Sequence, residues 1–573
     1  MGILFVAAPA LADQYRPPEG VQIVDYQFEV ELTPASDRIQ VREKLTALFS
    51  KASVRSLDLD LCSVSEVERQ DLAGPCQAPK SLAGQSPITT VGKGMTVASV
   101  SVNGLPALYD HRDDRLTVNL PQPSKAGQRL TIELRYGGVP AAGLVASRDK
   151  DGERVFFSDN WPNKGRNWLA TVDHISSKAT ATISVVAPSD YQVISNGRLT
   201  EEVDLPGRTR RTTWREAVRI PVWQFALGAA PMHVEHFGPV GGVEFSAWLS
   251  RENVGPDLDR IRDATRSVFA FYSERLGPYP FEKLAQVEAT GGSGAMENAS
   301  SIFYRSGFEP LPHEMAHQWF GNSVSESSWD EVWLSEGFAT YLDLLYIEHS
   351  RGREAFLAGL RHAQGIAVDY STKNPTSTIV HPKGSDENKL LRNAPQIYLG
   401  GALVLHTLRG VLGDPRFFSA LELYYARHRD GSVTTDDFRI AAQDACKASG
   451  PCPPELSDLS WFFDQWLRRG GLPHLQVDWS YDSARRFVTL QIRQLQPQGS
   501  YRIPVEVAVN TTRADTPSGR ARVVLAGPLT TVAIRSSTEP SEVQIDPELW
   551  APLMHVEVVK GRTTGVKADN SPP

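Results

Sequence analysis

The chain has 573 residues, of which 41% are hydrophobic and 22% are charged, a composition typical of soluble globular proteins and unlike that of disordered or fibrous ones. A single hydrophobic core stops growing near about 300 residues, so this length predicts two to four domains. The formal net charge is −8, which argues against nucleic acid and acidic membrane surfaces as partners.

The first residues of the chain are apolar. Residues 3–12 form an apolar run ending in Ala10, Leu11 and Ala12, which is typical of the hydrophobic segment and cleavage site of a secretory signal peptide. No positively charged residue precedes the run, so we interpret residues 1–12 as a signal-peptide remnant; the alternative is an unstructured apolar terminus. We therefore expect an exported protein, periplasmic or secreted, and no membrane span, because no stretch reaches about 20 apolar residues.

Residues 13–250 predict an N-terminal antiparallel β domain. Every second residue is apolar from Tyr26 to Leu32 and again from Leu116 to Leu120, which is the period of a half-buried strand. Gly and Pro interrupt these runs at short intervals, as expected for antiparallel strands joined by turns.

Four cysteines fall into two local pairs. The simplest of the three possible connectivities joins Cys62 to Cys76 and Cys446 to Cys452. Disulfides persist in oxidising compartments, which agrees with export. Four buried free thiols are the alternative, and a structural zinc site is not expected because neither pair has the short C-x-x-C spacing.

The pattern becomes helical in residues 251–471. Apolar residues recur at helical spacing from Leu258 to Tyr272, and further helices are predicted over residues 402–412, 415–428, 435–446 and 459–469. Strand alternation resumes at Leu475, so residues 472–561 predict a small β-sandwich. Residues 562–573 form a polar tail that we expect to be disordered. The predicted fold class is multidomain α+β.

The strongest chemical signal is the segment from His313 to His317, which reads H-E-M-A-H. Positions i and i+4 of a helix lie one above the other, so His313 and His317 can both reach one metal ion. Glu314 follows the first histidine and can be directed at a water molecule on that metal. The alternative is a pair of surface histidines without a ligand.

A second helix, predicted over residues 333–341, offers a third ligand. Its Glu336 is a carboxylate in a largely apolar setting and needs a cation as a partner. Two imidazoles and one carboxylate leave the fourth position of a tetrahedral zinc open, which is the arrangement of catalytic sites. We predict that His313, His317 and Glu336 bind one zinc ion, which lowers the pKa of its water to about 7. Glu314 would take the water's proton and later pass it to the leaving amine.

These motifs resemble those of the gluzincin aminopeptidases, the family of aminopeptidase N and leukotriene hydrolase. The family signature H-E-x-x-H, followed after eighteen residues by Glu, is met by His313, Glu314, His317 and Glu336. The second signature, G-A-M-E-N, is met by Gly294, Ala295, Met296, Glu297 and Asn298. The resemblance implies a thermolysin-like zincin catalytic domain over residues 251–471, and a zinc-dependent hydrolase that removes the N-terminal residue of peptides.

The second motif suits the recognition of a free N-terminus. A carboxylate binds an α-ammonium group by charge-assisted hydrogen bonds, and Glu297 is the candidate. The backbone of Gly294 and Ala295 can pair with an extended substrate, as in strand addition to a sheet edge. The alternative is an ordinary glycine-rich loop with a surface glutamate.

The resemblance also implies a downstream tyrosine that stabilises the oxyanion, in a Y-x-K-G context. Tyr398 occupies this place, while Gly400 replaces the usual lysine. Relatives place a Gln or Glu that helps to bind the amine where this chain has Trp161; we expect that Asp159 and Asn160 can compensate, or that Glu297 holds the amine mainly alone.

Two other kinds of protein are alternatives to an aminopeptidase. An endopeptidase or an epoxide hydrolase would use the same zinc, but Glu297 argues against an endopeptidase because internal peptide bonds offer no ammonium group. A catalytically silent scaffold usually loses a metal ligand or the general base, and here every expected one is present. The expected partners are peptides with a free N-terminus, with neither nucleic acid nor membrane involved, and the chain is expected to be a monomer.

Overall fold

The computed structural model describes residues 17–66, 76, 90–251, 254–291, 294–380, 393–510 and 517–560. The predicted signal-peptide remnant and polar tail lie outside these residues. The chain divides into two compact units, the first of residues 1–329, 383–387 and 425–434 and the second of residues 330–382, 388–424 and 435–573. In the described residues, no helix is long and apolar enough to cross a membrane.

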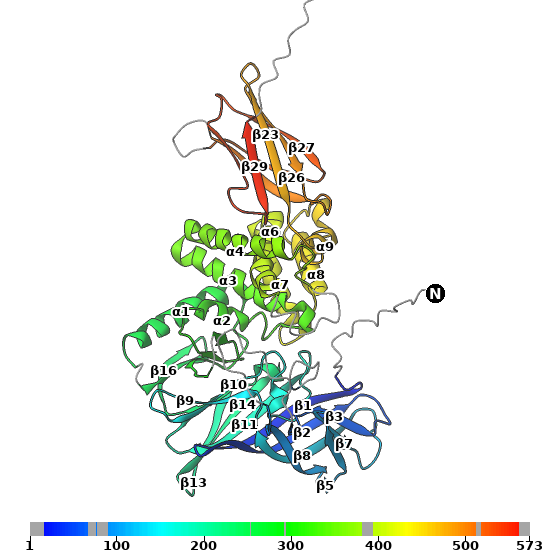
Figure 1. Ribbon diagram of the computed structural model, residues 1–573, viewed down its shortest axis with the longest axis vertical. Coiled ribbons are helices and arrows are strands. Elements are labelled where there is room, and N and C mark those ends of the chain that lie inside the picture. The colour runs from blue at the N-terminus through cyan, green and yellow to red at the C-terminus, as the bar shows by residue number, and fades with distance from the viewer. Residues whose placement is uncertain are drawn as a thin grey trace, which may run out of the picture. The chain divides into compact units, whose positions relative to one another are not determined.

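An eight-stranded sheet dominates the first unit (Figure 1). Its order is β13 (Arg198–Leu205), β14 (Thr209–Pro221), β11 (Lys178–Pro188), β1 (Val21–Thr33), β2 (Ser36–Phe49), β8 (Gln128–Val139), β4 (Gly94–Val102) and β5 (Leu105–Pro106). Neighbouring strands are antiparallel except for β1 and β11, which are parallel. The apolar alternation predicted from Tyr26 to Leu32 faces the core, where Tyr26 and Phe28 are 1% and 2% exposed.

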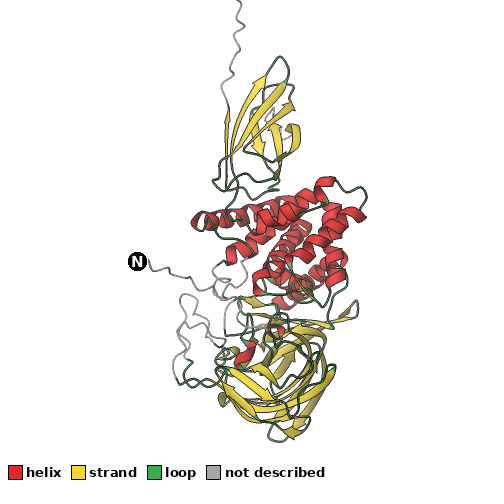
Figure 2. Cartoon of the chain, turned by 90° about the vertical axis from the view of Figure 1, so that its right-hand side faces the viewer, coloured by secondary structure: helices red, strands yellow, loops and turns green. Residues whose placement is uncertain are grey.

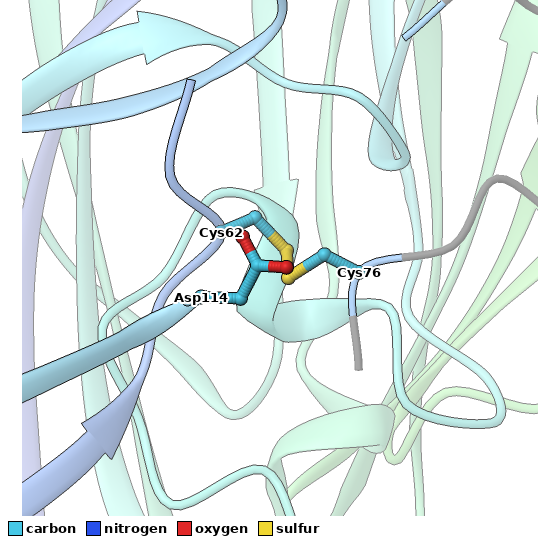
Figure 3. Close-up of side chains that lie close together, drawn as sticks. All are labelled: Cys62, Cys76 and Asp114. Carbon is cyan, nitrogen blue, oxygen red and sulfur yellow. A yellow bond between two sulfur atoms is a disulfide. The ribbon is translucent and has the colours of Figure 1, made fainter. Parts of the chain in front are cut away.

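Two smaller sheets complete the N-terminal β region. One has the order β12 (Gln192–Ser195), β15 (Leu227–Ala230), β10 (Arg154–Asp159) and β9 (Gly143–Arg148). The other has the order β3 (Ser56–Asp60), β7 (Arg115–Asn119) and β6 (Tyr109–Arg112). The predicted disulfide between Cys62 and Cys76 is confirmed, with Cα atoms 5.6 Å apart. Figure 3 shows the Asp114 carboxylate beside it, and this carboxylate accepts hydrogen bonds from the amide and hydroxyl of Ser63.

A five-stranded sheet and two helices in the same unit contain the two motifs. The order of the sheet is β16 (Met232–Val240), β17 (Val243–Ser250), β18 (Lys283–Glu288), β20 (Ser301–Tyr304) and β19 (Ala295–Met296). The sheet is accompanied by helices α1 (Pro256–Leu276) and α2 (Leu311–His317). Strand β18 is parallel to both β17 and β20, whereas β19 lies antiparallel at the end of the strand order.

The second unit begins with helices, shown in red in Figure 2. They are α3 (Trp333–Arg351), α4 (Arg353–Lys373), the π-helix η5 (Gln396–Gly400), α6 (Gly401–Leu412), α8 (Thr435–Ala448) and α9 (Ser460–Leu467); α7 (Asp414–His428) ends in the first unit. All the helices predicted from periodicity are confirmed, but α4 was not predicted. Its buried Phe356, Leu360, Ala363 and Ala367 recur at helical spacing, so the signal was present. The disulfide between Cys446 and Cys452 is also confirmed.

The β-sandwich at the end of the second unit is confirmed as well (Figure 1). One sheet has the order β27 (Leu529–Arg535), β24 (Phe487–Gln494), β23 (His474–Asp482) and β29 (His555–Lys560). The other has the order β26 (Pro517–Leu525), β25 (Ile503–Asn510) and β28 (Glu542–Ile545). With the β-rich first unit and the helices, this gives the predicted multidomain α+β class.

Candidate active site

Helix α2 places the two histidines of the H-E-M-A-H segment on one face. The Nε2 atoms of His313 and His317 lie 3.1 Å apart, and their rings are nearly perpendicular. His313 is half-buried and His317 is 1% exposed. Two nitrogen ligands at 2.0–2.1 Å from a tetrahedral zinc are separated by about 3.3 Å, so this imidazole pair fits a shared zinc ion.

Glu314 lies on the same helix and is 7% exposed. The neighbouring phenol of Tyr304 is also buried, and it donates a hydrogen bond of 2.7 Å to Gln286 Oε1. Burial raises the pKa of Tyr304 well above its usual value, and the negative charge of Glu314 raises it further. Tyr304 therefore stays protonated and uncharged beside this carboxylate.

The G-A-M-E-N segment forms an edge strand. Ala295 and Met296 pair with Tyr304 and Phe303 of β20. Gly294 directly precedes the strand with φ +76°, a backbone conformation that favours glycine, and its carbonyl accepts a hydrogen bond of 2.8 Å from the Arg305 amide. As the last strand in the order, β19 is the position where an extended peptide can add to a sheet.

Glu297 and Asn298 follow this strand and turn into the protein. Glu297 is 6% exposed and Asn298 is fully buried. The backbone carbonyl of Glu297 accepts hydrogen bonds from Gln318 Nε2 at 3.1 Å and from Asn322 Nδ2 at 2.6 Å. Gln318 directly follows His317, so the loop that carries Glu297 is tied to the end of the histidine helix.

The remaining candidates, Glu336 and Tyr398, belong to the second unit. Glu336 lies in the first turn of α3 and is 4% exposed, and its Oε1 accepts a hydrogen bond of 2.6 Å from the Tyr398 hydroxyl. Tyr398 lies in the π-helix η5, an irregular turn of a kind often found at functional sites.

Two facing glycines explain how the helices come close enough for this hydrogen bond. A Cβ at Gly337 would lie 3.0 Å from the Cα of Gly401, closer than ordinary packing allows. Gly400 lies against the side chain of Gln396: a Cβ there would be 2.6 Å from Gln396 Oε1.

The prediction that Asn160 can compensate at the amine site is wrong. Asn160 is fully buried, and it donates to the Phe225 carbonyl at 2.8 Å and accepts from Trp168 Nε1 at 2.9 Å, so its amide is committed to the core. Asp159 forms an ion pair with Lys164 at 2.9 Å. Trp161 packs edge-to-face on Trp329, with ring centroids 5.6 Å apart.

Three buried polar residues near the motifs were missed by sequence reasoning. Gln318 and Asn322 hold the Glu297 carbonyl, and Lys178 donates to the carbonyls of Gly431 at 2.6 Å and Ser323 at 2.9 Å. Their partners are 21 to 253 positions away along the chain, so no local pattern identifies them.

Two other groups of possible ligands are not metal sites in this structure. Cys62 and Cys76 lie near Asp114, but their sulfurs are joined in a disulfide and are not thiolates (Figure 3). The side chains of His233 and Glu235, two positions apart on β16, are 38% and 45% exposed and contact each other at 3.4 Å.

Comparison with known proteins identifies the family. Residues 309–466 match the Peptidase family M1 domain, and residues 92–223 match the Peptidase M1 N-terminal domain. The chain belongs to peptidase family M1. The catalytic match covers α2, α3 and η5, and so includes His313, Glu314, His317, Glu336 and Tyr398.

Two aminopeptidases are similar in sequence to part of this chain. Human glutamyl aminopeptidase is 25% identical over 351 residues, which are 56% of this chain and 35% of the relative. Aminopeptidase N of Streptomyces lividans is 26% identical over 430 residues, or 70% of this chain and 48% of the relative. The chain thus spans about a third to a half of the length of these relatives. A crystal structure of a mutant M1 zinc metallopeptidase from Deinococcus radiodurans superposes with a TM-score of 0.63 at 22% identity, covering 81% of this chain and 97% of that one, and so shares the fold.

Proposed function

We propose that this M1 peptidase is a zinc-dependent aminopeptidase that hydrolyses the N-terminal peptide bond of peptides. The observation that carries the proposal is the imidazole pair of α2, whose Nε2 atoms are spaced for one tetrahedral ion. His313, His317 and Glu336 would hold this single zinc. Their two nitrogens and one carboxylate oxygen make up a donor set that can hold a metal ion, and zinc sites that catalyse hydrolysis use the same donors.

The reaction needs a base and an oxyanion donor besides the metal. A bound zinc would polarise the scissile carbonyl and bring the pKa of water close to neutrality. Glu314, beside the first imidazole, would accept the proton of the attacking water and return it to the leaving amine. The Tyr398 hydroxyl, which donates to Glu336 in this structure, would donate a hydrogen bond to the substrate oxygen that develops negative charge.

Glu297 would make the enzyme an exopeptidase. Its carboxylate, largely shielded from water, would bind the α-ammonium of the substrate, while the backbone of Gly294, Ala295 and Met296 would pair with the extended peptide. Asn298 would support this loop from within the protein, since its side chain is fully buried. Trp161 offers an indole and no carboxylate, so Glu297 carries the ammonium charge without help from that position.

The setting of the enzyme follows from the disulfides. Two disulfides indicate an oxidising compartment, and we propose that the mature protein is exported, periplasmic or secreted. Peptides with a free N-terminus would be its partners. The monomeric state and the domain boundaries remain predictions.

A panel of aminoacyl anilides and their N-acetylated counterparts, assayed with and without a chelator, tests the function. We expect cleavage of the free-amine substrates alone, lost on chelation and restored by zinc. Cleavage of the blocked set would indicate an endopeptidase. No cleavage by a folded, zinc-loaded protein would favour a silent scaffold, and a scaffold would also purify without stoichiometric zinc.

Substitution of the amine anchor provides the residue-level test. We expect Glu297→Ala to lower kcat/KM by about 100-fold on free-amine substrates, because an ion pair shielded from water contributes a few kcal/mol. An equal loss on an N-acetylated substrate that the wild-type enzyme cleaves would contradict the anchoring role.

A further inference from the structure

The buried amide of Gln318 bridges two parts of the G-A-M-E-N loop. Its Nε2 donates to the Glu297 carbonyl at 3.1 Å, and its Oε1 accepts from the Ser300 amide at 2.9 Å. Gln318 is fully buried and directly follows His317 in the chain. The Gln318 side chain is therefore hydrogen-bonded to the loop on both sides of Asn298, and Gln318 is next in the chain to His317, a proposed zinc ligand.

The loop is held in a conformation that needs such support. Ser300 has φ +63°, in the left-handed region that is unfavourable for residues other than glycine. Its hydroxyl accepts a hydrogen bond from the Gly197 amide at 2.9 Å and lies 3.2 Å from Lys283 Nζ. Ser300 is thus hydrogen-bonded both to Gly197 of the N-terminal β region and to Gln318 at the end of the histidine helix.

A second amide acts on the same carbonyl. Asn322 Nδ2 donates to the Glu297 carbonyl at 2.6 Å, and Asn322 is also fully buried. Two converging donors leave this peptide group little freedom to move relative to His317. Neither side chain is exposed to solvent, so neither is placed to contact a substrate directly.

An aminopeptidase needs this restraint because its two recognition points are close together. The α-ammonium and the scissile carbonyl belong to the same residue, and only the N–Cα and Cα–C bonds, of about 1.46 and 1.52 Å, separate them. A shift of about 1 Å between the ammonium anchor and the metal would therefore misplace the reacting carbonyl and can cost about 100-fold in rate.

We propose that Gln318 is a positioning residue that sets the distance between the ammonium anchor Glu297 and the zinc-binding helix. The inference rests on the proposed aminopeptidase function and adds the residue that couples its two recognition points. Gln318 acts through the backbone of Glu297 and does not touch the substrate.

Binding of two zinc-directed inhibitors tests the inference without relying on turnover. Leucine hydroxamate and 4-methylpentanoyl hydroxamate differ only in the α-amino group, and both are titrated calorimetrically into zinc-loaded protein. We expect Gln318→Met to weaken the amine-bearing compound about tenfold or more, while the Kd of the amine-free compound changes less than twofold. Zinc content, measured by mass spectrometry, should stay at the wild-type level.

Gln224→Met is the matched control. Gln224 is also fully buried, and its amide donates to the backbone carbonyls of Gly321 at 3.1 Å and Asn322 at 3.5 Å, just beyond the same helix. Among the described residues, no hydrogen bond joins its side chain to residues 294–300. We expect this variant to bind the two hydroxamates in the wild-type ratio. An equal weakening of both compounds by Gln318→Met would show a merely structural role and overturn the inference.

Two further outcomes are informative. If Gln318→Met does not fold, Asn322→Ala removes the other donor to the Glu297 carbonyl, and the same selective loss is expected; an unselective loss overturns the inference. If the wild-type protein binds both hydroxamates equally, amine recognition itself fails, which is a failure of the proposed function and is distinguishable from a failure of Gln318 alone.

Discussion

Replacement of Lys178 by methionine should remove part of the pH dependence of stability. Lys178 is 6% exposed at the start of β11, and its ammonium donates to the carbonyls of Ser323 and Gly431. Burial lowers the pKa of Lys178 to about 7, although the charges of Asp430 and Glu326 act in the opposite direction. In the unfolded chain the pKa of a lysine returns to about 10.4.

The sign and size of the effect follow from linkage. Between about pH 7 and pH 10.4 the unfolded state binds the Lys178 proton and the folded state does not, so stability rises with pH in this window. When the unfolded state binds one proton more than the folded state, the free energy of unfolding rises by about 1.4 kcal/mol per pH unit. Between pH 7.5 and 8.5 the folded form is mostly deprotonated at Lys178, so this residue raises the free energy of unfolding by about 1.2 kcal/mol over that interval. Below pH 7 this contribution is absent.

The difference between wild type and variant isolates this residue. Burial also lowers the pKa of Lys283 to about 7, but that lysine is present in both proteins and cancels. We expect the free energy of the urea transition to rise by about 1.2 kcal/mol more in the wild type than in Lys178→Met from pH 7.5 to 8.5. Lys44→Met, which replaces an exposed lysine of β2, should leave the wild-type pH response intact.

Parallel pH responses of the wild type and Lys178→Met would refute this reasoning. They would mean that Lys178 keeps its proton, because the surrounding carbonyl oxygens stabilise the ammonium enough to offset its desolvation. The variant is expected to be less stable at both pH values, since those carbonyls lose a donor, and only the pH-dependent part distinguishes the two explanations.

Three further substitutions test the proposed site and its support. Glu314→Gln should lower kcat at least 100-fold while stoichiometric zinc remains, and retained activity would exclude Glu314 as the base. Tyr398→Phe should lower kcat by about 100- to 1,000-fold with little change in KM, as expected for an oxyanion donor, and an unchanged kcat would assign the phenol to packing. The buried Arg166 and Asp173 form an ion pair at 3.1 Å. Arg166→Met leaves the Asp173 carboxylate without this countercharge and should destabilise the first unit by about 3–5 kcal/mol in thermal unfolding. A wild-type melting temperature would contradict this.

Local sequence patterns predicted the elements and the donor set of the site. The i, i+4 spacing of His313 and His317 requires only a helix, and α2 supplies it because adjacent turns place these positions on one face. The strand and helix periods from Tyr26 onward, and the two disulfides, likewise depend on residues close together in the chain. Such features follow from short-range geometry, which the sequence alone specifies.

Contacts between distant segments were beyond the reach of those patterns. The parallel pairing of β1 with β11 joins residues about 155 positions apart, and the hydrogen bond from Tyr398 to Glu336 spans 62 positions. Sequence patterns also do not show which polar side chains become buried. The side chain of Asn160 suggested a role at the amine site, but folding buries it, where it hydrogen-bonds to Phe225 and Trp168.

The sequence by itself therefore determined the order of β-rich and helical segments along the chain, and it gave the candidates for the zinc ligands and the general base that we propose. Only the tertiary structure decided what supports those residues: the amides of Gln318 and Asn322 on the Glu297 carbonyl, the strained turn at Ser300, and the buried ammonium of Lys178. The physical reason is that a buried polar group must find a hydrogen-bond partner wherever the packed chain provides one, and that partner is set by three-dimensional packing and not by sequence spacing.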